Sequence, residues 1–211
     1  MSQLLLLLCA WAEVLACPAY SFQTFTVGQV LQASHMNQVE VNVRDHVHGT
    51  SSVVNQVVLA TEQATTSGTS IDFTGIPAGT RRIVVHGMGI STNGTSDYLI
   101  QLGDSGGVET SGYSGRADAE GAGSTTSLSA GFIVHVGPSA AAVHGIRAVI
   151  ELEDSTNNVW NMSSMSYAGS GQIRYCQGEK GLTAALDRVR LTTANGTDAF
   201  DAGAINIAYE G

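Results

Sequence analysis

The sequence predicts a mainly β protein: an antiparallel jelly-roll-like β-sandwich, preceded by an apolar N-terminal segment and one short helix. After residue 50, apolar residues recur with a period near two, as in strands that bury one face. Turn-forming stretches such as STNGTS and DSTNN separate these runs, and no helical period lies between them. A parallel α/β fold would need helices there. We therefore predict three parts: a docking segment at 1–26, a helical neck and hinge at 27–49, and the sandwich at 50–211.

The composition favours many tight turns and excludes nucleic-acid binding. The 211 residues include 25 glycines and 3 prolines, and 13% are charged, a low fraction for a globular domain. Nine Lys and Arg residues stand against 18 Asp and Glu, which gives a net charge of −9. Phosphate contacts need clustered cations, so no nucleic acid is an expected partner. Cys9, Cys17 and Cys176 follow no disulfide or zinc spacing and are expected to be free thiols.

The first 26 residues are expected to dock onto a partner protein or a neighbouring subunit. Their apolar run contains the residues predicted to make this contact: Leu4, Leu5, Leu6, Leu7, Leu8 and Trp11. A secretory signal would carry Lys or Arg before the run, and Glu13 interrupts it. The run is also too short to span a bilayer, so no membrane partner is expected. The alternative is a segment that folds back onto its own β-domain.

Residues 27–49 are predicted to form one short helix and a hinge. Ser34 is a suitable N-cap, and Gly49 is a suitable helix stop. The apolar positions between them recur at spacings of 3, 4 and 4 residues: Met36, Val39, Val43 and Val47. An isolated helix of about 14 residues is marginal in water. The stripe therefore predicts an oligomer neck, in which copies of the helix bury these side chains against one another.

Two histidines at the hinge, His46 and His48, form the metal site that the sequence suggests. Residues two apart face the same side of an extended segment. In a three-fold assembly, one such pair per chain supplies six imidazoles around the axis, a set suited to one octahedral transition metal. The alternative is two solvent-facing histidines without a metal. Loop carboxylates at Asp198 and Asp201 offer a second alternative, a calcium site. No other cofactor is expected.

Ten strands are predicted in the sandwich domain. Their ranges are Val53–Ala60, Ser70–Thr74, Arg81–Ile90, Tyr98–Gly103, Leu128–Val136, Gly145–Glu153, Val159–Ser166, Ile173–Cys176, Arg188–Thr193 and Ala204–Tyr209. The Gly/Ser/Thr-rich passage from Asp104 to Ser127 is predicted to be a large surface loop. Aromatic candidates for contact with a glycan are Tyr113, Trp160 and Tyr167, and Tyr113 is preferred because it alone lies in a long loop. Trp160 is expected in the core.

Catalytic motifs are weak. The stretch GDSGG at 103–107 spells the residues around a chymotrypsin-like nucleophile, but no matching His motif lies upstream. A glycosidase needs two carboxylates at a fixed separation, and the acidic residues here follow no recognisable pattern. Glu151 and Glu153 alternate along one strand and are expected on a solvated face. The sequence therefore favours a protein that is not an enzyme.

Three stretches together resemble a family of tailed-bacteriophage virion proteins. They are TFTVGQVLQASHMNQVEVNVRDHV at 24–47, FTGIPAGTRRIVVHGMGISTNGTSDYLIQLGDSGGVETSGYSG at 73–115, and FDAGAINIAYEG at 200–211. The shared positions are mostly glycines and turns, and they include no catalytic residue. The resemblance covers most of residues 24–211 and leaves the first 23 outside.

The resemblance implies a homotrimeric fibre or capsid-bound appendage with a β-sandwich head and no enzymatic activity. The first hypothesis is a tail fibre or tail-attached appendage, which docks by its N-terminus onto other phage proteins and presents the sandwich to host-surface glycans. The second is a capsid decoration or head-fibre protein. The third is a carbohydrate-active enzyme. Under the first two hypotheses, the protein belongs to the virion and is assembled in the host cytoplasm.

Overall fold

The computed structural model describes residues 57–120, 125–169 and 171–211, all within one compact unit, Ser52–Gly211. The predictions made for the N-terminal segment, the helical neck and the histidines of the hinge lie outside the described residues. No helix long and apolar enough to cross a membrane occurs within the described ranges.

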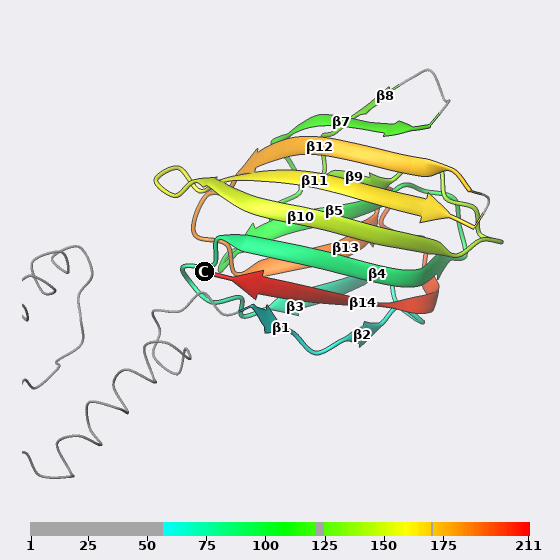
Figure 1. Cartoon of the computed structure of the whole chain (residues 1–211), viewed down its shortest axis with the longest axis horizontal. Coiled ribbons are helices and arrows are strands. Elements are labelled where there is room, and N and C mark those ends of the chain that lie inside the picture. The colour runs from blue at the N-terminus through cyan, green and yellow to red at the C-terminus, as the bar shows by residue number, and fades with distance from the viewer. Residues whose placement is uncertain (1–56, 121–124, 170) are drawn as a thin grey trace, which may run out of the picture. The chain divides into compact units, whose positions relative to one another are not determined.

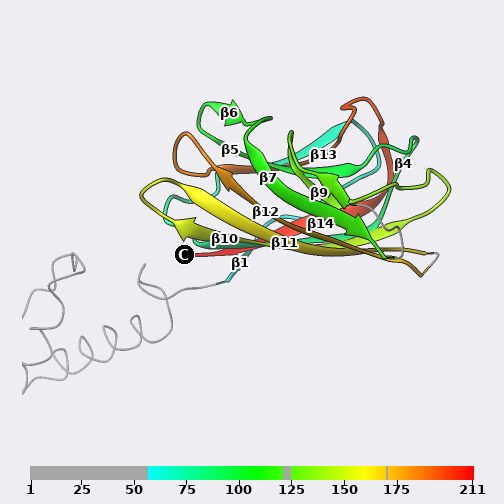
Figure 2. The ribbon, with the colours of Figure 1, turned by 90° about the horizontal axis from the view of Figure 1, so that it is seen from above.

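Two antiparallel sheets pack face to face (Figures 1 and 2). The nine-stranded sheet comprises β1 (Val58–Leu59), β2 (Gln63–Ala64), β4 (Arg82–Thr92), β7 (Tyr113–Ala119), β8 (Thr125–Ser127), β10 (His144–Asp154), β11 (Val159–Ala168), β12 (Ile173–Gly181) and β14 (Phe200–Glu210). The five-stranded sheet comprises β3 (Ser70–Thr74), β5 (Tyr98–Asp104), β6 (Gly107–Val108), β9 (Phe132–His135) and β13 (Arg188–Thr193). The prediction of a mainly β sandwich is confirmed.

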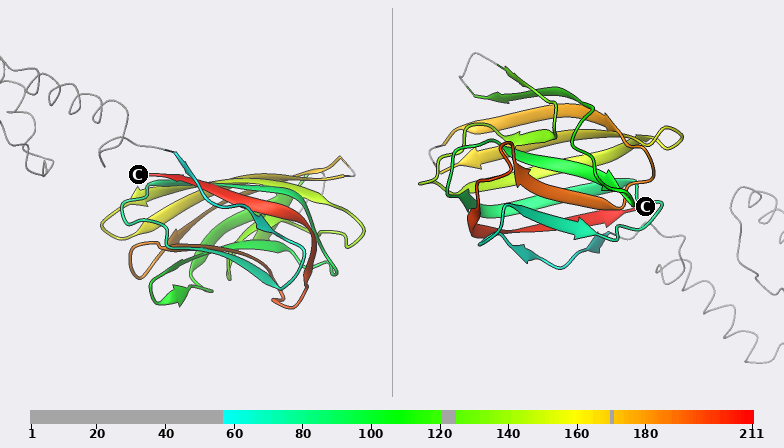
Figure 3. Two further views of the ribbon diagram at one scale, coloured as in Figure 1. Left: turned by 90° about the horizontal axis from the view of Figure 1, so that it is seen from below. Right: turned by 180° about the vertical axis from the view of Figure 1, so that it is seen from behind.

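The strand pairing is nested in the manner of a jelly roll. Going inward along the chain, β2 pairs with β14, β3 with β13, β4 with β10, and β5 with β9. This pairing places β2-β14-β4-β10 in one sheet and β3-β13-β5-β9 in the other. Eight strands wrapped in two layers this way are a jelly roll. The views from below and behind show the smaller sheet covering one face of the larger (Figure 3).

Most of the additional strands extend the larger sheet, whereas the smaller sheet gains only the two-residue strand β6 beside β5. The chain forms β7 and β8 between β5 and β9, and it forms β11 and β12 between β10 and β13. In space they continue the sheet beyond β10 in the order β11-β12-β7-β8. This extension gives the larger sheet an outer face that the basic jelly roll lacks.

The passage 104–127 is not a loop, and that prediction is wrong. It contains β6 and β7, and β8 lies at its end. The glycines that suggested a loop instead let strands approach closely. A Cβ on Gly115 would lie 2.3 Å from the carbonyl oxygen of Gln177, and one on Gly178 would lie 2.5 Å from Leu128 Cδ1. Glycine is therefore required where β7, β12 and Leu128 meet.

Each of the ten predicted ranges overlaps an observed strand, and two of them match β3 and β13 at both ends. The core lies between the sheets and takes the alternate, inward-facing residues of each strand. Its largest fully buried side chains are Tyr98, Phe132, Phe200, Ile83, Ile90, Ile100, Leu102, Ile150, Met162, Leu191, Ile205 and Ile207. Trp160 is 3% exposed and belongs to this core, as expected.

Candidate functional site

The polarity of strand β11 reverses along its length. Near its start, the inward-facing Trp160 and Met162 are buried in the apolar core. Near its end, the inward-facing residue is the buried Ser166, whereas Met165 and Tyr167 face outward and are 54% and 56% exposed. Large apolar side chains on the outer face of a sheet mark a contact surface more often than isolated exposed residues do. The outer face at this end is therefore the candidate site.

Strand register assembles a groove on this face. Two rows of outward-facing side chains cross β10, β11, β12 and β7: Arg147, Met165, Tyr175 and Asp118 in the first row, and Val149, Ser163, Gln177 and Arg116 in the second. The space between the rows, called the outer groove below, has a volume of about 420 Å³. Its floor is the backbone at Ser164, Cys176 and Ala117, whose side chains are buried on the other side of the sheet.

The cations of the outer groove have no carboxylate partner among the described residues. The ion pairs in that part of the chain involve other cations: Arg82, Lys180, Arg188 and Arg190. Arg116 is instead held by hydrogen bonds from Nη1 to the hydroxyl of Ser127 and, at 3.3 Å, to the carbonyl of Gly115. Asp118 is the one carboxylate in the groove, and its Oδ1 accepts the backbone N–H of Ala119 at 2.7 Å. The groove is thus locally positive on a chain of net charge −9.

Beside the groove, Tyr167 lies across a glycine of the neighbouring strand. A Cβ on Gly145 would lie 2.1 Å from Tyr167 Cε1 and 2.4 Å from its Cζ. The two residues are directly paired in the β10–β11 ladder, so the ring covers bare backbone. Met88, 76% exposed on β4, continues this apolar surface on the far side of β10.

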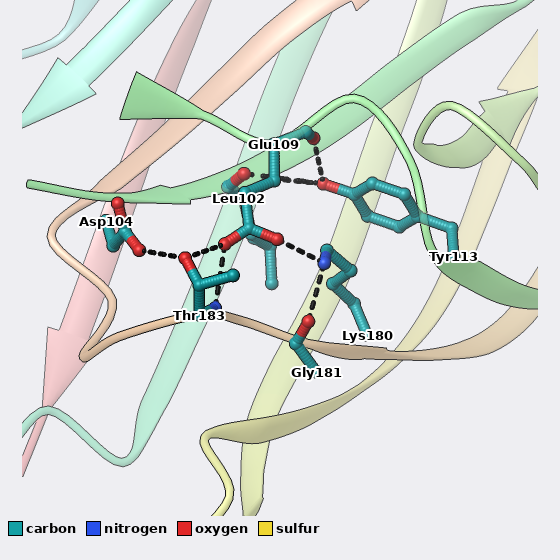
Figure 4. A network of polar contacts seen from close by, with 7 residues as sticks. All are labelled: Leu102, Asp104, Glu109, Tyr113, Lys180, Gly181 and Thr183. Carbon is teal, nitrogen blue, oxygen red and sulfur yellow. Dashed lines mark hydrogen bonds and ion pairs between the residues drawn. The ribbon is translucent and has the colours of Figure 1, made fainter. Parts of the chain in front are cut away.

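Tyr113 is not a glycan contact, and that prediction is wrong. It begins β7, is 5% exposed, and packs edge-to-face on Phe132 with ring centroids 4.9 Å apart. Its hydroxyl accepts the backbone N–H of Leu102 at 2.7 Å and donates to the carbonyl of Glu109 at 3.0 Å (Figure 4). Burial raises the pKa of this hydroxyl above its ordinary value. Because the passage forms a strand and not a loop, the alternation of that strand turns Tyr113 inward.

Tyr113 adjoins a satisfied polar network that joins two loops (Figure 4). Lys180 Nζ, 4% exposed, donates to the Glu109 carboxylate and to the carbonyl of Gly181. Thr183 donates its backbone N–H to Glu109 Oε1 at 2.8 Å and its hydroxyl to Asp104 Oδ2 at 2.7 Å. Burial opposes ionisation of Glu109, but the donors from Lys180 and Thr183 hold its pKa below the ordinary value. The network is a structural clamp whose charges are already paired.

The segment GDSGG forms a hairpin turn at the edge of this network. Asp104 pairs with Gly107 across the turn, and its Oδ1 accepts the backbone N–H of Gly106 at 2.7 Å. The serine between them, Ser105, is exposed. The motif is explained by turn chemistry.

A buried histidine pair occupies the inner side of the sheet opposite the outer apolar surface. The rings of His135 and His144 lie 4.2 Å apart, and neither side chain is more than 1% exposed. His135 Nδ1 lies 2.8 Å from the hydroxyl of Ser166, and His144 Nδ1 lies 3.1 Å from the carbonyl of Ile90. Burial first, then His144 and Arg174, lower the pKa of His135 to about 3. Both imidazoles are inaccessible to a ligand from outside.

The described residues contain no cluster of side chains that could bind a metal ion. No group of three or more His, Cys, Asp and Glu side chains converges there, and the predicted pair His46 and His48 lies outside that part of the chain. At the alternative calcium position, the Asp198 carboxylate already accepts the N–H of Ser96 at 3.0 Å and the amide of Asn195 at 2.6 Å. Asp198 therefore fastens two loops together.

Sequence reasoning missed the residues of the outer groove. The alternation of residues along β12 could have indicated them, because Tyr175 shares a face of the strand with Gln177 and Glu179, and both of these are exposed. The sequence alone does not show which face of β12 is exposed, because the opposite face carries Arg174 and Lys180, two charged residues that are buried in the structure. Which of two mixed faces is buried depends on the partner sheet.

No family model, no curated protein and no solved structure matches this chain. The jelly roll, its extended sheet and the outer groove therefore carry the functional interpretation, together with the motifs at 24–47, 73–115 and 200–211.

Proposed function

We propose that the protein is a non-enzymatic structural component of a tailed-phage virion, a tail fibre or tail-attached appendage. Residues 1–26 dock onto other phage proteins, residues 27–49 form the neck of a homotrimer, and the sandwich faces outward to contact the host surface. The sequence resemblance supports the virion assignment. The jelly roll supports a rigid binding head, because binding surfaces placed on a stiff scaffold are well ordered.

The path of the chain is the observation that carries the proposal. Strand β1 pairs with the end of β14, with Val58 opposite Tyr209, so the polypeptide enters the sandwich beside its C-terminal strand end. In Figure 1 the C-terminus lies at one end of the sandwich, and β1 begins near it. Residues 1–56 are therefore joined to the sandwich at the end where its C-terminal strand finishes.

A capsid decoration or head-fibre protein is the alternative, since the same tether would serve on a shell. A carbohydrate-active enzyme is less well supported. The outer groove contains one carboxylate, Asp118, whereas hydrolysis of a glycosidic bond uses two.

Labelling of purified particles tests the assignment. With gold-labelled antibody against the sandwich, we expect label at one vertex and a few dozen copies at most. Hundreds of copies spread over the shell would support the decoration alternative, and particles without label would refute both. Deletion of residues 1–22 should yield a soluble sandwich that no longer joins particles, because the docking leucines are removed. Normal incorporation of the truncated chain would refute N-terminal docking.

The trimeric neck is tested separately. The double change Val39→Asp and Val43→Asp places charges on the predicted stripe, and light scattering should then report monomers, since buried unpaired carboxylates are strongly unfavourable. A surviving trimer would place oligomerisation in the sandwich. The matched control is Glu40→Gln, a predicted solvent-facing position on the same helix.

A further inference from the structure

We propose that the outer groove binds an acidic saccharide, a sugar chain that carries carboxylate, sulfate or phosphate groups. The inference deepens the proposed host-surface contact by naming the ligand class, and it rests on that proposed function only for its biological setting. The binding itself is a property of the isolated protein.

The charged side chains of the groove favour a saccharide over a protein partner. Of the eight side chains in the two rows, five are polar or charged and three are apolar: Arg116, Asp118, Arg147, Ser163 and Gln177 against Val149, Met165 and Tyr175. The centre of a protein–protein interface is instead depleted in charge. Sugar sites combine an aromatic or apolar platform for the carbon face of a ring with planar polar groups for its hydroxyls. Tyr175, 46% exposed, and Met165 supply the platform.

Charge selects an acidic sugar over a neutral one. Arg147 and Arg116 lie at opposite sides of the groove, on β10 and β7, and neither has a carboxylate partner among the described residues. A guanidinium donates two parallel hydrogen bonds to a carboxylate or phosphate. Gln177 is already oriented by its bond to Asn161 Oδ1 at 2.8 Å, and Arg116 is oriented by Ser127. The donors are thus partly fixed before a ligand arrives, which reduces the entropy lost on binding.

The groove also has the shape of a chain-binding site. It crosses four adjacent strands, a length of about 14 Å from three inter-strand spacings of about 4.8 Å. The small side chain of Ser163, between Val149 and Gln177 in the second row, leaves the groove open at its middle. A short oligosaccharide lying across the strands would contact Tyr175 at its centre and one arginine toward each end.

Calorimetric titration of the full-length protein tests the inference. The probes are an oligogalacturonate, a heparin-derived sulfated oligosaccharide and a neutral maltooligosaccharide of the same length. We expect at least one acidic probe to bind, the neutral probe to bind about tenfold more weakly or worse, and the affinity to fall as salt is added. Equal binding of neutral and acidic probes, or no binding of either acidic probe at millimolar concentration, would overturn the proposal.

Matched variants locate the site. Arg147→Gln and Tyr175→Ala should each weaken acidic-probe binding about tenfold or more, because each removes one recognition element. The controls are Arg81→Gln, an exposed arginine, and Leu59→Ala, an exposed leucine, both outside the groove. Circular dichroism confirms that each variant is folded. Equal loss in the controls would overturn the assignment to this groove.

Light scattering of Tyr175→Ala distinguishes a saccharide site from a subunit contact. An unchanged oligomeric state supports the proposal, and a smaller assembly would show that another copy of the chain covers this face, which overturns it. Particle labelling remains an independent test. Saccharide binding without label on particles would refute the virion assignment alone, and labelled particles with no saccharide binding would refute this inference alone.

Discussion

Strand β12 buries a cation near each of its ends, and the two cations have different surroundings. Lys180, 4% exposed, bonds to the Glu109 carboxylate and lies over the Tyr113 ring, 5.5 Å from its centroid. Arg174, 8% exposed, donates from Nε to the carbonyl of Val136 at 3.1 Å, and its Nη1 has no hydrogen-bond partner in the described part of the chain. One buried charge is neutralised, and the other is not.

The difference separates a stable end of the sheet from an acid-sensitive end. At the Lys180 end, a carboxylate and several donors satisfy each other, so the network holds the loops in place. At the Arg174 end, the positive charge lies near His135 and His144 and helps to lower the pKa of both, after burial as the main cause. The outer face at this second end carries the exposed Tyr175.

Replacement of each cation by methionine should separate the two ends of β12 most strongly. Lys180→Met leaves Glu109 in a largely buried position without its counter-ion and should lower the free energy of unfolding by about 3–5 kcal/mol. Arg174→Met removes a charge that had no counter-ion and should lower it by about 1 kcal/mol or less, the value of its one hydrogen bond. Urea unfolding measures both. Equal losses of unfolding free energy in the two variants would show that Lys180 and Arg174 contribute equally to stability, which would contradict the difference between the two ends.

The double variant Lys180→Met with Glu109→Gln serves as the control for the Lys180 end. Because it removes both charges, it should recover part of the loss caused by Lys180→Met alone. No recovery would assign the loss to packing of the lysine chain and not to the unpaired carboxylate.

Acid should destabilise the end of the sandwich that holds Arg174, His135 and His144, by less than the loss expected for Lys180→Met. The pKa of His135 is lowered from 6.5 in the unfolded chain to about 3 in the native protein. Between these values the unfolded state binds a proton that the native state does not, so stability is fully present above about pH 6.5 and falls as the pH falls toward 3. The slope contributed by this histidine is at most about 1.4 kcal/mol per pH unit.

Unfolding curves at several pH values between 7 and 4.5 measure this slope. His135→Gln should make it shallower, and the control is His86→Gln, an exposed histidine on β4 of the larger sheet. Identical slopes in the wild type and His135→Gln would refute an acid-sensitive histidine pair.

The smallest effect concerns the outer surface at the same end. Gly145→Ala would place a methyl group on the Tyr167 ring, which is exposed and free to move, so we expect a loss of about 1 kcal/mol or less. In the Tyr167→Ala background, the same change should cost nothing further, because the ring is gone. Unfolding free energies of the four variants form a double-mutant cycle, and strict additivity would contradict the contact.

Individual strands could be predicted from the sequence where their signal lies in neighbouring residues. The period-two residue pattern of β3 (SIDFT) and β13 (RVRLTT), bounded by turn-forming residues, predicted both strands at both ends. Strand β7 was missed because its glycines resemble loop composition, although they serve close approach to β12. Tyr113 was misplaced for the same reason. In the candidate site, Arg147, Met165 and Tyr175 were not found, since they come from three strands whose register is set by pairing across the sheet.

A jelly-roll-like β-sandwich was predictable from strand alternation and turn chemistry, which are properties of neighbouring residues, and the nested pairing of distant strands in the structure makes it a jelly roll. The packing of the two sheets sets which face of β11 and β12 is buried. The tertiary structure also joined Glu109 to Lys180, which are 71 positions apart, and brought Arg147 and Arg116 to the two sides of one groove. The physical reason is that a strand with charged and apolar residues on both faces takes its orientation from the sheet that covers it.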